Sequence, residues 1–364
     1  MALIMRRAGL VLLALLLLAL AFFAALTAFE YRPAEEEKTA VVPGNAAEPL
    51  PAGAALRVLS WNLGYGALGD NADFFMDGGR GVYTADESRV LRNLADIRET
   101  VKSLSPDLCL LQEVDTDSDR SRHIDEAAWF RAAFPGFSSA FAFNHRALFV
   151  PFPIPPVGRV NAGLLTLSRY AVEPEAARLS LPCPFAWPIR TAQMKRCLLL
   201  TRIPVSDGKE LVLVNLHLEA YDSGEGKIAQ TQKLVSVLRE ESEKGNYVIA
   251  GGDFNQFFTG EDQQTYAVRD GLWRPGILER ERFGDGLSLF CDSGTPTCRS
   301  LDRPYAGADP DDFQYYAIDG FILSDNIGVL SVETRDAGFV ASDHNPVLLT
   351  CRLRADGASI GPAQ

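Results

Sequence analysis

Short apolar runs alternate with longer amphipathic stretches through most of this 364-residue chain. A run of four to eight apolar or β-branched residues is typical of a strand buried in a sheet. We expect such strands at Leu56–Trp61, Leu108–Leu111, Gly163–Leu167, Leu211–Leu218, Tyr247–Ala250, Ile318–Leu323 and Pro346–Arg352. The helical stretches between them predict a layered α/β domain.

Two stretches carry clear helix signals. Thr84-Ala-Asp-Glu87 has the sequence of a capping box, and apolar residues follow it at intervals of three and four from Val90 to Leu104. Ser105-Pro106 predicts the end of this helix. A second helix is expected at Gly226–Lys244, with Gly245 as its left-handed cap.

Residues 1–29 differ from the rest of the chain. Arg6 and Arg7 precede an uncharged stretch, Ala8–Phe29, which as a helix would span about 33 Å. This length crosses a bilayer and exceeds the apolar region of most secretory signals. It favours an uncleaved signal anchor over a cleaved signal or a buried core helix. Positive residues on the cytoplasmic side would leave the rest of the chain outside the cytoplasm, membrane-anchored or secreted.

The remaining chain divides into three parts. Residues 30–54 are rich in Ala, Glu and Pro without an apolar period, which predicts a flexible linker. Residues 55–354 form the expected globular domain, and residues 355–364 form a C-terminal tail. Inside the domain, we expect irregular or peripheral structure in the long polar loops Gly64–Tyr83 and Gln256–Ala317.

Composition and charge narrow the classes of ligand. Hydrophobic residues make up 47% of the chain and charged residues 23%, as in a globular protein with a sizeable core. The formal net charge of −12 argues against a protein that grips long DNA by releasing counterions. It does not argue against phosphate chemistry, because a bound divalent cation can reverse the local charge.

The cysteines leave two interpretations open. They form a pair around each of two proline-containing segments, plus two isolated residues: Cys183 and Cys197, Cys291 and Cys298, Cys109 and Cys351. In an exported protein the two pairs are reasonable disulfides. Buried free thiols are the alternative, and they fit Cys109 and Cys351 better because both lie in apolar, strand-like runs.

Polar residues gather where the predicted strands end. They are Asn62, Glu113, His217, Asp253, Asn255, Asp319, Asp343 and His344. A strand end is where an α/β sheet presents side chains to a ligand. Carboxylate and amide oxygens suit Mg²⁺ or Mn²⁺, whereas too few thiols or histidines cluster here for a zinc site. Histidines near carboxylates can transfer protons near neutral pH, so the set predicts metal-assisted hydrolysis.

Each of these residues also has an ordinary structural explanation when taken alone. Glu113 fits a solvated loop carboxylate, Asn62 a turn residue and His217 a satisfied core histidine. The order of the motifs along the chain is more specific than any one of them.

Seven motifs occur in a fixed order: Trp61-Asn62, Gln112-Glu113, Gly163-Leu-Leu-Thr-Leu-Ser-Arg169, Asn215-Leu-His217-Leu, Gly252-Asp-Phe-Asn255, Ile318-Asp319-Gly and Ser342-Asp-His344. Together they resemble the endonuclease/exonuclease/phosphatase superfamily, which contains DNase I-like nucleases, neutral sphingomyelinases and inositol-polyphosphate phosphatases. The resemblance covers residues 55–354, which it makes a catalytic domain. It implies a four-layered α/β sandwich, in which two packed mixed sheets are flanked by helices.

The resemblance implies a metal site beside a proton-transfer group. Glu113 would be the principal ligand of Mg²⁺ or Mn²⁺, with Asn62 and Asp343 close to the metal. His344 would act as a general base or as a cationic phosphate contact, and Asp319 would hold its ring.

The other motif positions would act on the water and the phosphate. Asp253 and Asn255 would orient the attacking water and contact the phosphate. His217 would bond a non-bridging oxygen or help to protonate the leaving group. Asn215 and Arg169 are expected among the substrate-binding residues.

The substrate is less determined than the chemistry. A phosphodiester in nucleic acid or in a phospholipid headgroup is favoured, and phosphomonoesters, small nucleotides or a non-catalytic binding role are the alternatives. The apolar N-terminal stretch favours a membrane substrate, and the aromatic, proline-rich run Phe141–Val157 is either an apolar lip near a bilayer or a packed, stiff loop. No protein partner is evident from the sequence.

Overall fold

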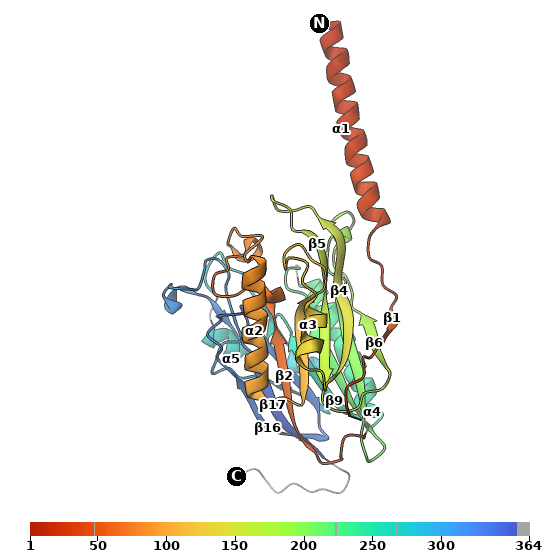
Figure 1. Ribbon diagram of the computed structural model, residues 1–364, viewed down its shortest axis with the longest axis vertical. Helices are drawn as coiled ribbons and strands as arrows, with labels where there is room; N and C mark the ends of the chain where they lie inside the picture. The colour runs from red at the N-terminus through yellow and green to blue at the C-terminus, as the bar shows by residue number, and fades with distance from the viewer. Residues whose placement is uncertain (47, 223, 267, 355–364) are drawn as a thin grey trace.

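The computed structural model of the protein describes residues 1–46, 48–222, 224–266 and 268–354 (Figure 1). The expected C-terminal tail, residues 355–364, lies outside the described residues. The helices are α1 (Ala2–Ala28), α2 (Glu87–Leu104), α3 (Glu126–Ala133), α4 (Glu225–Glu243) and α5 (Gly260–Thr265).

Most strands belong to two mixed sheets. The first sheet has the order β1 (Glu36–Ala40), β6 (Glu175–Ser180), β7 (Cys197–Pro204), β8 (Glu210–His217), β9 (Tyr247–Asp253), β15 (Asp319–Ser324) and β12 (Leu287–Phe290). The second has the order β16 (Ile327–Thr334), β17 (Val347–Leu353), β2 (Ala55–Asn62), β3 (Leu108–Asp115), β5 (Gly158–Ser168) and β4 (Ser138–Val150). Two short pairs lie outside them, β10 (Gln256–Phe257) with β11 (Gly276–Ile277) and β13 (Cys298–Arg299) with β14 (Tyr315–Tyr316).

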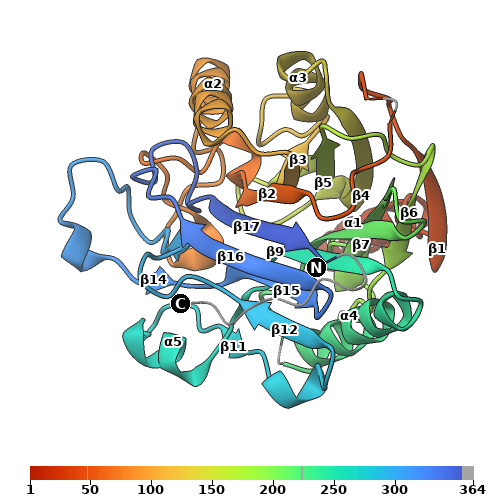
Figure 2. The same cartoon turned by 90° about the horizontal axis from the view of Figure 1, so that it is seen from below.

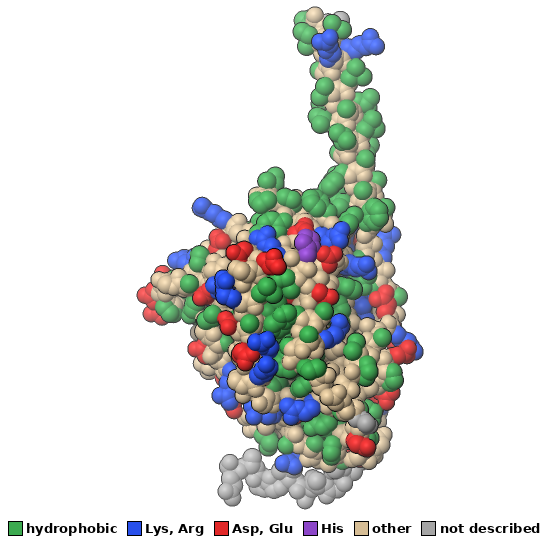
Figure 3. Space-filling model, viewed as in Figure 1, with side chains coloured by type: hydrophobic (Ala, Val, Ile, Leu, Met, Phe, Trp, Pro, Cys, Tyr) green, Lys and Arg blue, Asp and Glu red, His purple; other side chains and the backbone are tan. Residues whose placement is uncertain are grey.

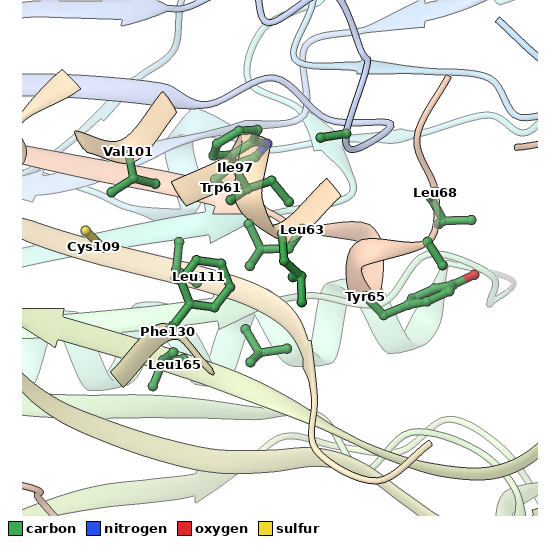
Figure 4. Close-up of a cluster of buried hydrophobic side chains, with 14 of the residues drawn as sticks. Trp61, Leu63, Tyr65, Leu68, Ile97, Val101, Cys109, Leu111, Phe130 and Leu165 are labelled. Carbon is green, nitrogen blue, oxygen red and sulfur yellow. The ribbon is translucent and has the colours of Figure 1, made fainter. Parts of the chain in front are cut away.

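The two sheets pack face to face, and helices cover their outer faces (Figure 2). Successive residues of a strand point to opposite faces, so β2 contributes to two cores. Leu56 and Val58 lie between the sheets, whereas Leu59 and Trp61 pack beneath α2 and α3 (Figure 4). α4 covers the other sheet through its own apolar cluster. This is the expected four-layered α/β sandwich.

All seven predicted strands are present, but the start of α2 differs from the prediction. Its N-cap is Asp86, whose carboxylate accepts a hydrogen bond from the Arg89 backbone N–H. The Thr84 hydroxyl instead donates to a backbone carbonyl in the preceding loop, at 2.7 Å. The ends of both helices are as predicted, since α2 stops at Leu104 and Gly245 after α4 has a φ of 82°.

The expected linker is partly wrong, because it contributes to the sheet. Residues 36–40 form β1, which pairs antiparallel with β6 at the sheet edge. Val42 forms a bridge with Ser139, and the fully buried Leu50 forms one with Val205. An edge strand held by backbone pairing leaves little apolar pattern, so the sequence did not reveal it.

The cysteines are free thiols, so neither local disulfide is present. Cys109 and Cys351 are fully buried in β3 and β17, where the sequence places them in apolar strands. Cys298 lies in β13, beside the polar residues described below.

α1 projects from one end of the sandwich (Figure 1). Its apolar segment Leu3–Ala28 has 26 residues and is long and apolar enough to cross a membrane. The base of the helix contacts the domain, where the Trp187 indole N–H donates to the Thr27 hydroxyl at 3.0 Å. The Phe23 ring lies 6.1 Å from the Trp187 ring.

Candidate active site

Three neighbouring strands bring His217, Asp253 and Asp319 side by side. His217 of β8 pairs in register with Asp253 of β9, which pairs with Asp319 of β15. Residues directly opposite each other in adjacent strands point to the same face of a sheet. Accordingly, His217 Nε2 lies 3.4 Å from Asp253 Oδ2.

The second sheet delivers Glu113 through an irregularity in β3. The pairing of β3 with β5 shifts register between Leu111 and Val114, and Glu113 within this shift has a φ of 54°. A left-handed backbone is uncommon for a residue other than glycine, and such shifts redirect side chains toward sites. The Glu113 carboxylate thereby reaches Asn62 at the end of β2, whose Nδ2 donates to Oε1 at 3.2 Å.

Asn62 connects the two sheets. It is buried, and its Nδ2 also donates to Asp253 Oδ2 at 3.0 Å. Its oxygen accepts a hydrogen bond from the Gly64 backbone N–H at 3.1 Å. Through these bonds, Asn62 holds the carboxylates of Glu113 and Asp253 at a fixed separation.

The segment that carries Asp343 and His344 is tied to the end of β2. The Trp61 indole N–H donates to the His344 carbonyl at 2.8 Å. The Ser342 hydroxyl donates to the Asn62 carbonyl, also at 2.8 Å. These bonds fix the direction in which the two side chains enter the site.

The His344 ring lies between two aspartates. Its Nδ1 is 2.9 Å from Asp319 Oδ2, and its Nε2 is 3.8 Å from Asp253 Oδ2. Burial opposes a charge on this ring, but the Asp319 carboxylate and the Cys298 thiol outweigh it and raise the His344 pKa well above its usual value. The ring is therefore a buried cation at neutral pH.

His217 lies in the opposite kind of environment. Burial, followed by the positive charge of Arg196, lowers its pKa well below the usual value, so the ring is neutral. Among the described residues, its Nδ1 has no hydrogen-bond partner. A site that holds one cationic and one neutral histidine has the groups for acid and base roles.

The carboxylates of the site crowd one another. Burial and the charge of Asp319 raise the pKa of Asp253 to about 7. Burial, with a contribution from Glu113, raises the pKa of Asp343 to about 6. This accumulation of negative charge is what a bound cation relieves. Two sets place possible metal-binding atoms within 4.8 Å of one another: Asp253, Asp319 and His344, and Cys298, Asp343 and His344.

Residues 59–344, a span that includes every one of these side chains, match the sequence model of the Endonuclease/Exonuclease/phosphatase family. The chain belongs to this family. Among curated proteins, none matches the chain by sequence.

Several solved structures share the fold of this chain. A protein of that description from Beutenbergia cavernae is 19% identical, with a TM-score of 0.54, over 82% of this chain and 72% of its own. One from Leptotrichia buccalis is 15% identical, with a TM-score of 0.53, over 81% and 99%. ANGEL2, described as a 2',3'-cyclic phosphatase, is 13% identical, with a TM-score of 0.53, over 89% and 100%. At these identities the likeness supports the fold alone.

Two residues that the sequence predicted to bind substrate, Asn215 and Arg169, lie outside the cleft. Asn215 is fully buried between the sheets, where its Nδ2 donates to the carbonyls of Leu111 and Leu165 at 3.1 Å each. Arg169 follows β5 at the opposite end of the sandwich, and its guanidinium lies 3.4 Å from an Asp107 carboxylate oxygen. Sequence proximity to a motif does not set the end of the strand at which a side chain emerges.

The structure adds a stacked pair to the wall of the cleft. The Arg120 guanidinium lies 3.8 Å from the centre of the Tyr65 ring and donates to both oxygens of Asp115, at 2.9 and 3.0 Å. Arg120 and Tyr65 both line the cleft with Glu113 and His344. Tyr65 lies in one of the loops expected to be irregular, where the sequence offers no pattern to mark it.

A second pair closes the other side of the cleft. The Tyr221 hydroxyl donates to Asp77 Oδ1 at 2.9 Å, across 144 positions of sequence. Burial raises the pKa of Asp77 to about 7. Asn255 also lines the cleft, with its Nδ2 donating to the Leu218 carbonyl at 2.9 Å and its backbone N–H to Asp253 at 2.8 Å.

Proposed function

We propose that this protein is a divalent-metal-dependent phosphodiester hydrolase. The observation that carries the proposal is the convergence on one cleft of a cationic His344, a neutral His217 and the carboxylates of Glu113, Asp253 and Asp343. A phosphoryl transition state gathers negative charge on its non-bridging and leaving oxygens. Prepositioned donors and a cation stabilise that charge, and a carboxylate of near-neutral pKa can accept a proton from water.

The raised pKa of His344 favours the cationic of the two roles expected for this ring. Asp319 holds Nδ1, so Nε2 is left to donate to a non-bridging phosphate oxygen. Asp253 then orients the attacking water and takes up its proton, because its pKa of about 7 suits a base near neutral pH. Asn255 and His217, which also line the cleft, would contact the phosphate.

The residues fit a hard divalent cation. Glu113 and Asp343 present carboxylate oxygens to the cleft, and burial together with the charge of Glu113 raises the pKa of Asp343 although His344 and Arg299 lie near it. Oxygen donors are the ligands that Mg²⁺ and Mn²⁺ prefer. We therefore assign Glu113 and Asp343 as the direct ligands, with Asn62 as the residue that orients Glu113. A bound ion there would neutralise charge on the phosphate oxygens.

The location follows from α1. A helix of this length and hydropathy would hold the catalytic domain at a membrane, outside the cytoplasm by the position of Arg6 and Arg7. Protease protection of the domain in sealed vesicles tests that orientation. Cleavage of α1 during export would instead release a secreted enzyme.

The experiment that tests the activity uses the full chain in detergent with bis-nitrophenyl phosphate. We expect hydrolysis with added Mg²⁺ or Mn²⁺ and none after chelation. Nitrophenyl phosphate, assayed in parallel, separates a diesterase from a monoesterase. Absence of turnover with every divalent metal would contradict the proposal and favour a binding role for the fold.

A further inference from the structure

Two loops rise from the same end of the sandwich as the active site. β3 runs antiparallel to β5, so the end of β3 near Glu113 lies beside the start of β5, where Asp115 pairs with Ala162. The loop 151–157, between β4 and β5, therefore extends beyond the site. The start of β7 lies beside the end of β8, since Leu198 pairs with Leu216, so the loop 181–196 extends from that end too.

These loops expose large apolar side chains. The exposed fraction is 70% for Phe152, 92% for Ile154, 55% for Trp187 and 61% for Ile189, and Leu148 at the end of β4 is 47% exposed. We call these five residues the apolar collar. Single exposed apolar residues are ordinary, but a group of them on adjacent loops marks an interaction surface. Figure 3 shows hydrophobic side chains gathered at this end of the domain, beside the base of α1.

The collar connects α1 to the cleft. On one side, the Trp187 ring of the collar lies 6.1 Å from the Phe23 ring of α1, and Phe149, next to Leu148, lies 6.4 Å from the Phe22 ring. On the other, the Phe152 ring lies 6.3 Å from the Phe75 ring, and the neighbouring Phe74 and Met76 line the cleft. Gln193 and Met194, on the same loop as Trp187, line it as well. Apolar contacts therefore lead from the membrane-length helix, through the collar, to Phe74 and Met76 at the rim of the site.

The side chains of the collar fit a lipid bilayer better than a nucleic acid. Residues 150–157 read Val-Pro-Phe-Pro-Ile-Pro-Pro-Val, without a charged or hydrogen-bonding side chain. Such a loop offers nothing to the phosphates of a nucleic acid, which need cations. A tryptophan next to an arginine-bearing turn, as in Trp187 and Arg190, is typical of the bilayer interface. The collar lies beside the C-terminal end of α1, a helix that is apolar enough to span a bilayer.

We propose that the apolar collar inserts into the outer boundary of the bilayer spanned by α1, and that the cleft opens onto a phospholipid whose headgroup phosphodiester is the substrate. This inference rests on the proposed phosphodiesterase activity. The collar carries the enzyme to the level of the headgroups, and the short apolar path from the collar to the cleft rim lets the acyl chains remain in the membrane while the phosphate reaches His344.

Insertion is tested without activity, using the full chain reconstituted into phosphatidylcholine vesicles that contain brominated acyl chains. The reporter variant is Phe152→Trp in a Trp187→Phe background, and the matched control is Leu330→Trp in the same background. Leu330 is 62% exposed on β16, away from the collar. We expect the bromolipids to quench the added tryptophan at 152 by about half and to leave the one at 330 unchanged, since short-range quenching requires burial in the acyl region. Equal emission changes at both positions would overturn the insertion.

Substrate class is tested with the pair Phe152→Ser/Ile154→Ser and the control Leu330→Ser. Neither Phe152 nor Ile154 is among the residues that line the cleft. Loss of two apolar side chains that would be buried in the bilayer should lower hydrolysis of phospholipid in vesicles about 10-fold or more. Hydrolysis of bis-nitrophenyl phosphate should stay within about twofold, because the cleft is intact. The control should match the parent protein on both substrates.

The outcomes separate the two proposals. Turnover of the soluble diester without turnover of any phospholipid would overturn the lipid substrate and leave the phosphodiesterase standing. No turnover of either substrate, with quenching at position 152, would contradict the proposed activity while supporting the membrane surface. Absence of quenching together with a stable dimer in detergent would assign the collar to a second copy of the chain and overturn the inference.

Discussion

At the cleft end of the sandwich, burial and neighbouring carboxylates raise the pKa values of Asp253 and Asp343, whereas at the other end Glu241 is paired with an arginine. The Arg202 guanidinium donates to Glu241 at 2.6 and 3.0 Å and to Glu210 at 2.6 Å. The hydrogen bonds that Glu241 accepts from Arg202, Lys244 and Asn246 lower its pKa to about 2 against the cost of burial. At the cleft, by contrast, the pKa values of Asp253 and Asp343 are raised to about 7 and about 6.

The difference separates carboxylates that stabilise the folded protein from carboxylates that are placed for catalysis. A paired carboxylate favours its ionised state and stabilises the folded protein. A crowded carboxylate raises the free energy of the folded state until a cation or substrate arrives. The backbone supports this reading, since Glu113 and Asn255 at the cleft have φ values of 54° and 52°. Strain of this kind collects at functional sites.

The largest effect is expected from Glu113→Gln. Loss of a ligand carboxylate should lower the turnover of bis-nitrophenyl phosphate about 1,000-fold or more, without loss of thermal stability, because the change relieves repulsion. Steady-state kinetics and calorimetry measure the two quantities. Glu333→Gln, at a half-exposed pair with Arg335, is the matched control and should retain activity. A decrease smaller than tenfold would remove Glu113 from the metal site.

Asp319→Asn should have the next largest effect. The Asp319 carboxylate is the main group that raises the His344 pKa against burial, so the ring of the variant loses its proton at lower pH. If His344 acts as a cation, activity should fall about 100-fold at pH 8 and recover partly toward acidic pH. A pH–rate profile and NMR titration of the His344 ring test this. Asp325→Asn, exposed at the far end of the same strand, should leave the profile unchanged.

Glu241→Gln should affect stability and spare catalysis. It replaces a charge-assisted pair with Arg202 and should lower the free energy of unfolding by about 1–3 kcal/mol. The Glu241 pKa is lowered from 4.5 to about 2, so its contribution is present above the higher value and lost as the pH falls through the lower one. Urea unfolding at several pH values should show the difference between parent and variant shrinking below pH 4.5. If Glu241→Gln lost turnover at unchanged stability, the carboxylates at this end of the sandwich would not be purely structural.

The smallest effect is stabilisation by the metal itself. At ten times its dissociation constant, Mg²⁺ should stabilise the parent protein by about 1.4 kcal/mol, because it binds the folded site alone. Glu113→Gln should lose this gain, whereas Glu241→Gln should keep it. Melting curves with and without Mg²⁺ make the comparison, and equal gains in all three proteins would place the ion elsewhere.

Much of the fold and the site could be predicted from local pattern. The central strands are visible because both their faces are buried, as in Leu211–Val214, so they form nearly continuous apolar runs. Strands β4, β6 and β16 were not predicted, because partly exposed faces dilute that signal. The strand β7 was missed as well, although it is buried and begins with the apolar run Cys197–Leu200. The order of the polar motifs identified the family. It did not reveal Tyr65, Arg120 or the Asp77–Tyr221 pair, which lie in loops without periodicity.

The sequence by itself determined the apolar helix, the buried strands and the type of each polar residue at their ends. Only the tertiary structure decided which of those residues meet. Register between β8, β9 and β15 sets His217, Asp253 and Asp319 side by side, while the same sandwich turns Asn215 into the inter-sheet space and leaves Arg169 at the far end. The physical reason is that side-chain direction depends on strand register and on which end of a strand faces the cleft. Those quantities are fixed by long-range pairing, and a local pattern does not contain them.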